Sequence, residues 1–386
     1  MTPEIHTITT LAEFEGLKNQ WDRLVLAMST PTPFMLHSWL AEWWRHHGRR
    51  RSMFVATQVR DGQIVAGLPF EVEQKGPLRV LHFMGRHHAA LADVVAVDAE
   101  TARTSTKPLL DHVSSVAAPD YANLFGLRAD ARFAAGLEHA ERLMVRRVDS
   151  PVLDLSDGWD TVYKRKTSSK RRNLHRRRWR QLGEEGEVTV AIASDPDAVS
   201  AAMDDAFRLH DLRWRGRPDG SEFTTLDGRP FNAAAARRLA EDGVARLLTL
   251  SVAGRPVAFH YYLMLAKRMY VYRLAFDPAL GKCSPGLLAT LAALEAAAEE
   301  GATRVEYLGG GERYKLELSD DISPMNQLIG LPSTTRGQVA SFVTRGVVNG
   351  RLRLKESPRA RAFYFETLAP ARRLLRRAPT HSTGDE

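Results

Sequence analysis

Residues 276–315, FDPALGKCSPGLLATLAALEAAAEEGATRVEYLGGGERYK, hold the pattern from which a fold can be predicted. A short polar loop with two glycines and a proline runs directly into an Ala- and Leu-rich helix pattern, and RVEYLG (304–309) predicts a strand behind it. The first N–H groups of a helix lack backbone partners and carry partial positive charge, so helix starts of this kind bind anions. The loop is therefore a candidate phosphate site, with an ordinary strand-to-helix turn as the alternative.

The residues before the loop predict a three-stranded antiparallel meander over 245–277, with turns at AGR and KR. In that position Gly281 and Gly286 allow the backbone to approach a ligand closely, and the N–H groups around 284–288 can point at phosphate oxygens. A helix over 285–300 follows the loop. The order meander, loop, helix and strand favours the phosphate interpretation over the ordinary turn.

The first half of the chain repeats this order of elements. Its turn DGQIVAG (61–67) is similar to AGRPVAF (253–259) in the second half, and each is followed by more strand, a helix and a strand. We therefore expect two duplicated α/β lobes. The elements expected in the first half are helices over 9–28, 37–48 and near 100–117, a hairpin over 53–73 and a strand over 121–127.

Composition and charge limit the class of protein. The chain has 386 residues and a net charge of +8, from 54 Lys and Arg against 46 Asp and Glu. The lone cysteine, Cys283, cannot form an internal disulfide, which fits a reducing compartment. The start MTPEIHTITT lacks the segments of a signal peptide, and no apolar run approaches the roughly 18 residues of a membrane span. These features predict a soluble cytoplasmic protein. The His-rich GRHHAA (85–90) has no carboxylate or Cys partner at ligand spacing, so we expect no metal.

Meander, glycine loop, helix and parallel strand are also the core order of the GCN5-related N-acetyltransferase (GNAT) fold. DPALGKCSPGLL followed by EYLGGGERYK further resembles the CelD/BcsL-type acetyltransferase family, a tandem-GNAT group related to the FemABX peptidyltransferases. PFMLHSWLAEWWRHHG, KRRNLHRRRWRQLGEEGEV and LHDLRWRGRPDGSEF extend the resemblance over most of the chain. It implies an α/β fold of two GNAT-like lobes, with mixed central sheets flanked by helices. The expected divisions are residues 1–150, residues 151–335 with an acyl-CoA site, and residues 336–386 as a basic helical tail.

The resemblance implies acetyl-CoA, or another acyl-CoA, as the co-substrate. The first lobe's loop GRHHAALADVV (85–95) lacks the paired glycines, so that lobe is expected to have lost cofactor binding. In the second lobe the expected cofactor-binding residues lie on the last meander strand and in the loop: Arg273, Ala275, Gly281, Lys282, Ser284, Gly286 and Leu287.

Transfer from a thioester to an amine needs a base, oriented reactants and an acid near the departing thiolate, but no protein nucleophile. Glu306, at the end of the strand beside the thioester in such a fold, is the first candidate for the general base, and Glu312 is the second. Tyr314 is the candidate acid. A strand-end carboxylate paired with Arg304 is the alternative for Glu306, and packing or snorkelling is the alternative for Tyr314 and for Lys315.

This segment departs from the family pattern at four positions. Glu306, Tyr307, Gly309 and Gly311 stand where the family often has Asp, Phe, Arg and Asp. The missing Arg puts the charge balance on the substrate side, and hence the acceptor, in doubt.

Five residues are candidates for contact with the acceptor. His210 and Trp214 are one turn apart on a helix and share a face. Lys315 could bind an acceptor carboxylate or phosphate, and Arg172 belongs to a basic run. His260 lies in the apolar strand VAFHYYLML. For the two histidines and the tryptophan, core packing is the alternative.

The basic run 164–180 contains ten Lys and Arg. A solvated face balanced by nearby glutamates, an anionic acceptor, or the phosphate backbone of RNA would each account for it. We expect an acyl-CoA-dependent N-acyltransferase that acts on an amine of a small molecule, sugar or peptide. Two alternatives remain: an aminoacyl-tRNA-dependent transferase, as in the Fem-type relatives, and a non-catalytic module that binds through its basic surface.

Overall fold

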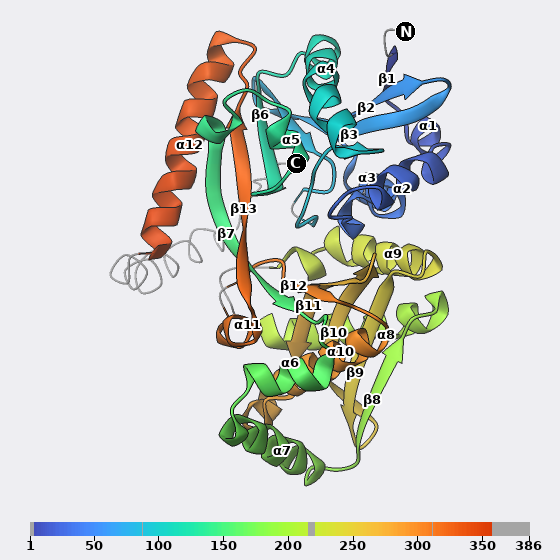
Figure 1. Ribbon diagram of the computed structural model, residues 1–386, viewed down its shortest axis with the longest axis vertical. Helices are drawn as coiled ribbons and strands as arrows, with labels where there is room; N and C mark the ends of the chain where they lie inside the picture. The colour runs from blue at the N-terminus through green and yellow to red at the C-terminus, as the bar shows by residue number, and fades with distance from the viewer. Residues whose placement is uncertain (1–3, 87, 215–220, 311, 357–386) are drawn as a thin grey trace, which may run out of the picture.

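The computed structural model describes residues 4–86, 88–214, 221–310 and 312–356 (Figure 1). Over these ranges 13 strands form one continuous mixed sheet, in the order β1-β2-β3-β4-β6-β13-β7-β12-β11-β10-β9-β8, with β5 paired to β3. The strands are β1 (Glu4–Ile8), β2 (Arg51–Arg60), β3 (Gln63–Lys75), β4 (Leu78–Phe83), β5 (Val95–Ala96), β6 (Tyr121–Arg128), β7 (Met144–Asp154), β8 (Val188–Ala193), β9 (Ala245–Val252), β10 (Arg255–Leu265), β11 (Arg268–Phe276), β12 (Arg304–Glu306) and β13 (Asp321–Gly330).

Helices cover both faces of this sheet (Figure 1). The α-helices are α1 (Leu11–Glu15), α2 (Lys18–Leu26), α3 (His37–His47), α4 (Ala99–Ala117), α5 (Arg132–Ala135), α6 (Trp159–Lys166), α7 (Ser169–Gly183), α8 (Pro196–Trp214), α9 (Gly228–Glu241), α10 (Pro285–Glu299), α11 (Arg313–Leu318) and α12 (Thr335–Glu356). Short 3₁₀ turns are η1 (Pro33–Met35), η2 (Ala140–Leu143), η3 (Glu222–Thr224) and η4 (Pro278–Cys283).

The sheet joins two lobes that share their last strands. We call β1 to β6 with α1 to α5 the first lobe, and β8 to β12 with α6 to α11 the second lobe. β7 and β13 run antiparallel to each other between them, with β13 paired to β6 of the first lobe and β7 paired to β12 of the second. The boundary expected near residue 150 falls inside β7, so both lobes use this strand, and the division into domains stays a prediction.

The meander expected over 245–277 is confirmed as β9, β10 and β11, and α10 follows it as expected. The strand expected over 304–309 is shorter, because β12 ends at Glu306. The chain then turns through φ of 130° at Gly309 and 100° at Gly310. These left-handed conformations suit glycine and end a strand.

Most first-half elements match the sequence predictions: α3, the β2–β3 hairpin, α4 and β6 all lie where they were expected. The single helix expected over 9–28 is two helices instead. α1 ends at Glu15 and α2 begins at Lys18, with Gly16 as the cap between them. Only Gly16 and Leu17 separate the two helices. The apolar spacing continues across this break, which is why the sequence predicted one helix.

Both faces of β10, a central strand of the second lobe's sheet, are buried. β10 is buried along nearly its whole length, because α8 and α9 pack on one face and α10 on the other. A strand that is buried on both faces is expected to be continuously apolar, as RPVAFHYYLML is. The edge where β11 meets β12 therefore lies between two packed layers.

The basic tail expected over 336–386 begins with α12, which packs on β6, β7 and β13. Residues 357–386 lie outside the described residues. Within the described ranges no helix is both long enough and apolar enough to cross a membrane.

Candidate active site

Two neighbouring strands of the second lobe separate and leave an open strand edge. β11 pairs in parallel with β12 only over 268–270, whereas β11 itself continues to Phe276. A bulge marks the point of separation: Tyr261 lies opposite Arg273 and Tyr262 lies opposite Val271, so β11 contains one extra residue. Bulges of this kind bend a strand away from its neighbour and are common beside active sites. The freed edge of β11 offers backbone groups to an extended ligand.

The start of α10 lies at the end of that open edge. Ser284, the N-cap residue, has a left-handed conformation (φ 53°, ψ 51°), and its side chain makes no capping hydrogen bond. Pro285 follows in the first turn, which contains no acidic residue. Asp277 fixes the loop from the other side, because its carboxylate accepts the Ala279 N–H at 2.9 Å and an Arg255 N–H at 3.1 Å. The first N–H groups of α10 are thus left without a side-chain cap, as an anion site requires.

The two glycines of the loop serve different ends. A Cβ on Gly286 would come within 2.6 Å of the Phe276 ring, so glycine lets α10 pack against the end of β11. Gly281 has open space around it and is exposed, as is Lys282. Ala275 is buried in β11, and Leu287 packs against the core of the second lobe.

Arg273, at the bulge, lies between the open edge and the other face of the sheet. Its guanidinium carbon is 4.0 Å from the Tyr272 ring centre and 5.8 Å from that of Phe223, and Nη1 donates to the Tyr272 carbonyl. Its charge also lowers the pKa of Lys315, after the larger effect of burial. Arg273 therefore links the bulge of β11 with Phe223 of η3.

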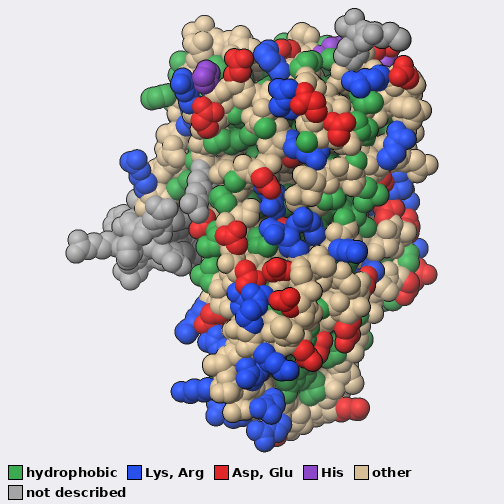
Figure 2. All heavy atoms as spheres, viewed as in Figure 1, with side chains coloured by type: hydrophobic (Ala, Val, Ile, Leu, Met, Phe, Trp, Pro, Cys, Tyr) green, Lys and Arg blue, Asp and Glu red, His purple; other side chains and the backbone are tan. Residues whose placement is uncertain are grey.

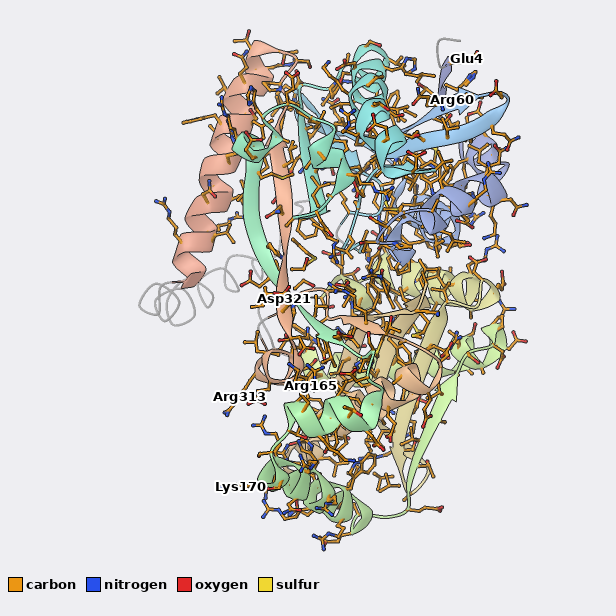
Figure 3. The ribbon with its side chains drawn as sticks, viewed as in Figure 1. Glu4, Arg60, Arg165, Lys170, Arg313 and Asp321 are labelled. Atoms are coloured by element: carbon orange, nitrogen blue, oxygen red, sulfur yellow. The ribbon has the colours of Figure 1, made fainter. Side chains whose placement is uncertain are left out.

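The basic helix α7 packs against η4 and α10. Arg172 donates to the carbonyl oxygens of Lys164 and Thr167, so it secures the end of α6 and does not reach toward the acceptor side. Arg171 pairs with Glu317. Lys and Arg side chains gather over the lower end of the second lobe, and Lys170 and Arg313 lie on that side (Figures 2 and 3). α7 thus brings positive charge to the border of the candidate phosphate loop.

Glu306 is completely buried at the junction of the two lobes. Its carboxylate accepts hydrogen bonds from three arginines: Arg304 at 2.8 Å, Arg268 at 3.1 Å and, from the first lobe, Arg128 at 3.1 Å. A carboxylate has about four acceptor positions, so little capacity is left for a substrate proton. Sequence reasoning named Arg304 as a partner and missed Arg128, which only the sheet brings to this point.

Lys315, Glu312 and Tyr314 lie together beyond β12. Lys315 Nζ donates to the Gly309 carbonyl at 2.6 Å and lies 3.1 Å from Glu312 Oε2. Burial lowers the pKa of Lys315, whereas burial and the nearby Glu312 charge raise the pKa of Tyr314. A side chain on Gly310 would collide with the Glu312 carboxylate. This segment therefore offers a partly exposed carboxylate next to a hydroxyl that stays protonated.

The two candidate histidines of the second lobe are both buried and neutral. Burial lowers the pKa of His260 to about 3, to which the Lys315 charge adds, and neither ring nitrogen has a partner among the described residues. Burial lowers the pKa of His210 to about 4, with Arg273 as the next cause. His210 stacks on Trp214 with ring centres 5.6 Å apart, and its Nδ1 lies 3.4 Å from Thr224 Oγ1. Both are placed as core residues that border the site.

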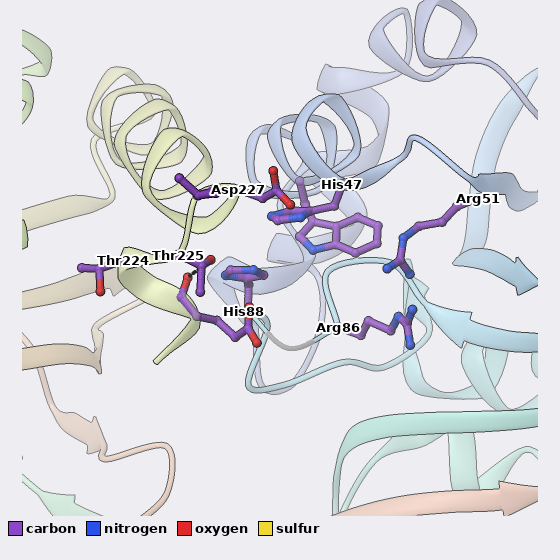
Figure 4. Close-up of a pocket in the computed structure, with 10 residues that line it drawn as sticks. His47, Arg51, Arg86, His88, Thr224, Thr225 and Asp227 are labelled. Carbon is purple, nitrogen blue, oxygen red and sulfur yellow. Dashed lines mark hydrogen bonds between the residues drawn. The ribbon is translucent and has the colours of Figure 1, made fainter. Parts of the chain in front are cut away.

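A pocket of about 640 Å³ lies between the lobes (Figure 4). His47 and His88 stack there with ring centres 4.7 Å apart, and Arg51 and Arg86 lie side by side at one end. Both arginines pair with the buried Glu71 at 2.7 Å. The pocket is lined by Trp43, His47, Arg51, Arg86 and His88 of the first lobe and by Glu222, Thr224, Thr225, Leu226 and Asp227 of the second.

Sequence reasoning named none of these pocket residues. The run WWRHHGRRR (43–51) mixes aromatic, imidazole and guanidinium groups at a helix end, which was the available signal. Thr224 connects the pocket to the rest of the site, because it contacts His210, which in turn lies near Arg273. Thr224 and His210 therefore lie between the pocket and the Arg273 side of the sheet.

Comparison with known proteins agrees with this geometry. Residues 169–316 match the family described as acetyltransferase (GNAT) domain. Among solved structures, FemX is 11% identical over 84% of this chain and 96% of its own, with a TM-score of 0.58. A conserved protein of unknown function from Bacteroides thetaiotaomicron VPI-5482 is 12% identical over 84% of this chain and 99% of its own, with a TM-score of 0.51. A tandem GNAT protein from the clavulanic acid biosynthesis pathway is 12% identical over 86% of this chain and 100% of its own, with a TM-score of 0.48. No curated protein matches the chain.

The FemX match covers both lobes, and at this identity it shows the fold alone. The predicted fold class, α/β with two GNAT-like lobes, is confirmed, except that the lobes share one continuous mixed sheet in place of separate central sheets. The GNAT match spans β11, η4, α10 and β12, the elements that form the open edge and the helix start.

Proposed function

We propose that this chain is an N-acyltransferase that moves an acyl group, most simply acetyl, from a coenzyme A thioester to an amine. One observation carries the proposal: the uncapped start of α10 lies at the end of the edge that β11 exposes where it leaves β12. The GNAT match over residues 169–316 supports it.

The residues of the second lobe suit the parts of acyl-CoA in turn. The N–H groups at the start of α10 and Lys282 would hold the pyrophosphate, because each charge-assisted hydrogen bond contributes roughly 1.5–3 kcal/mol. The amide groups of the pantetheine arm would pair with the free edge of β11. The cations of α7, which packs against η4, would contact the remaining phosphate.

The reaction needs one base and one acid. The amine loses a proton to the base and attacks the thioester carbonyl; the C–N bond forms, the C–S bond breaks, and the acid protonates the departing thiolate. We assign the base to Glu312, because three arginines occupy the Glu306 carboxylate whereas Glu312 is partly exposed. Lys315 orients Glu312, and Tyr314, whose hydroxyl stays protonated, is the acid.

The acceptor amine would enter through the pocket between the lobes. Arg51 and Arg86 are paired with Glu71 and Glu73, and Glu222 and Asp227 also line the pocket, so the lining offers polar groups of both signs. Trp43, His47 and His88 suit a ring or apolar part of the acceptor. Burial lowers the pKa of His47 to about 4, so the imidazole is neutral at physiological pH. A polar small molecule, sugar or peptide amine that carries a ring or apolar part fits this lining.

A negative charge in the first turn of α10 tests the cofactor assignment. Leu287→Glu places a carboxylate where the pyrophosphate would lie, and we expect acetyl-CoA to bind about 100-fold more weakly by titration calorimetry. Leu287→Gln is the matched control, since it changes the packing in the same way but adds no charge. Equal affinity in the Glu and Gln variants would contradict the assignment.

An aminoacyl-tRNA donor is the second candidate, favoured by the basic surface of α7. The two candidates differ in the donor that supports transfer. If the chain is an acyl-CoA-dependent transferase, purified protein with a panel of amines should release free thiol from acetyl-CoA without any added tRNA. Product formation only with a charged tRNA would select the second candidate.

A further inference from the structure

α12 carries an apolar face that no described residue covers. Its inner face, with Ala340, Val348 and Leu352, packs on a small core formed by residues of β4, β6, β7 and β13. At about 100° per residue, the exposed apolar side chains fall within an arc of about 140° on the opposite side. They are Val339, Phe342, Val343 and Val347, with exposed fractions of 63%, 73%, 55% and 48%.

The same region holds nearly all of the chain's excess charge. Residues 336–386 contain eleven Lys and Arg against four Asp and Glu, which is +7 of the whole chain's +8. Arg345 and Arg351 flank the apolar face of α12 by their helical spacing. The 30 residues that follow α12 include six arginines and the aromatic run FYF (363–365).

We infer that the outer face of α12 binds the surface of an anionic lipid bilayer, with the helix parallel to the membrane. An apolar face bordered by arginines is the pattern of a helix that lies at the lipid headgroups, where the side chains insert and the guanidiniums meet anionic lipid. A second copy of the chain would bring the same positive charge to the contact. RNA would leave Phe342 and its apolar neighbours without a partner.

The position of α12 is compatible with catalysis at a membrane surface. Figure 1 places α12 on the far side of β7 and β13 from α3 and α9, the helices next to the interlobe pocket. A bilayer on the outer face of α12 would leave that pocket accessible. The inference does not depend on the proposed acyl transfer, because it concerns binding alone.

Vesicle co-sedimentation of the full chain tests the inference. We expect the protein to sediment with vesicles of phosphatidylcholine mixed with phosphatidylglycerol, and little with phosphatidylcholine alone. Phe342→Ser with Val343→Ser should lower the partition coefficient about 10-fold or more, since two inserted side chains are lost. Arg345→Gln with Arg351→Gln should lower it about 10-fold, and high salt should do the same to the wild type.

The matched control is Val190→Ser with Ile192→Ser on β8, which removes two apolar side chains that are 44% and 40% exposed in the second lobe. This variant should bind vesicles as the wild type does. Failure of the wild type to bind, or equal binding by the α12 variants, would overturn the inference. So would light scattering that shows a dimer which Phe342→Ser with Val343→Ser converts to a monomer.

A labelled variant asks whether the chain covers this face by itself. The lone Cys283 is buried, so Phe342→Cys can be labelled selectively with a fluorophore. Iodide should quench the label strongly in the free protein and weakly after phosphatidylglycerol vesicles are added. A label already shielded without vesicles would mean that residues 357–386 cover the face, and the inference would fall.

Discussion

The two lobes place a helix after the third meander strand, and the two helices begin differently. In the first lobe α4 begins at Asp98, whose carboxylate accepts the Thr101 N–H at 2.7 Å, and Glu100 adds a second negative charge in the first turn. In the second lobe α10 begins at Ser284, with no side-chain cap and no acid. One start is already satisfied and negative, whereas the other is open to an anion.

The strand edges beside these helices also differ, because the edge in the first lobe is covered whereas the edge in the second lobe is open. β4 and β6 pair over only two residues, but the loop residues 88–95 of the first lobe fold back into the opening: the Ala92 N–H donates to the Gly126 carbonyl at 2.9 Å. Gly126 has φ of 90°, and a Cβ there would lie 2.9 Å from the Ala90 carbonyl oxygen. The first lobe therefore fills with its own backbone the place that the second lobe keeps open along β11. We propose that only the second lobe binds acyl-CoA.

The largest expected effect concerns the ends of the corresponding strands β6 and β12, where Arg128 and Glu306 pair across the lobes. Glu306→Ala leaves three partly exposed arginines without their shared buried carboxylate, so we expect the free energy of unfolding to fall by about 1.5–3 kcal/mol. Urea unfolding of the variant against the wild type measures this.

Glu306→Gln separates a structural from a catalytic role, because it keeps the shape and loses the charge. A structural role predicts a smaller but clear loss of stability. A general-base role predicts near-normal stability with thiol release reduced by the 10²–10⁴-fold typical of such groups. The second result would return the base to Glu306 and contradict the assignment to Glu312.

The sequence predicted the elements that depend on contacts between residues close in the chain, and it missed those that depend on contacts between distant residues. The meander, α10 and the loop between them follow from local apolar period and Gly or Pro positions, and all were expected. β13 was not: it contains Pro324, and it becomes a strand because it pairs with β6 and β7 from far earlier in the chain. β1 and β8 were also missed; both are short edge strands at the ends of the sheet.

The same limit applies to the site. Arg273 and Ser284 could be placed from the pattern, because the strand and helix that carry them are local. Arg128 at Glu306, and the pocket built from α3 and η3, result from the packing of the two lobes and have no periodic signal.

The next expected effect is on the pH dependence of the free energy of unfolding, compared for one buried histidine in each lobe. Burial lowers the pKa of His82 in the first lobe to about 4 and that of His260 in the second to about 3, against 6.5 when unfolded. As the pH falls below 6.5, these two histidines become protonated in the unfolded chain but stay neutral in the folded chain. The free energy of unfolding is therefore intact above pH 6.5 and falls by up to ~1.4 kcal/mol per pH unit for each histidine.

Gln substitutions test this, since Gln does not titrate. Urea unfolding at several pH values should give a shallower slope for His82→Gln and for His260→Gln. His82→Gln should also cost stability at neutral pH, because Nδ1 of His82 lies 2.8 Å from the Asn123 carbonyl whereas His260 has no partner among the described residues. Unchanged slopes in both variants would mean that neither histidine is buried as neutral imidazole.

The smallest expected effect comes from removing the side-chain cap at the start of α4. Asp98→Ala removes the cap of the Thr101 N–H, and we expect a small loss of stability, below that of the variants above, seen as a lower urea midpoint. Acetyl-CoA should still bind to one site per chain by calorimetry, because the loop residues 88–95 continue to fill the opening between β4 and β6. A second binding event would show that the capping carboxylate alone had closed the first lobe, and that its loop can move aside. A single binding event would show that the loop itself, and not the capping carboxylate, keeps acetyl-CoA out of the first lobe.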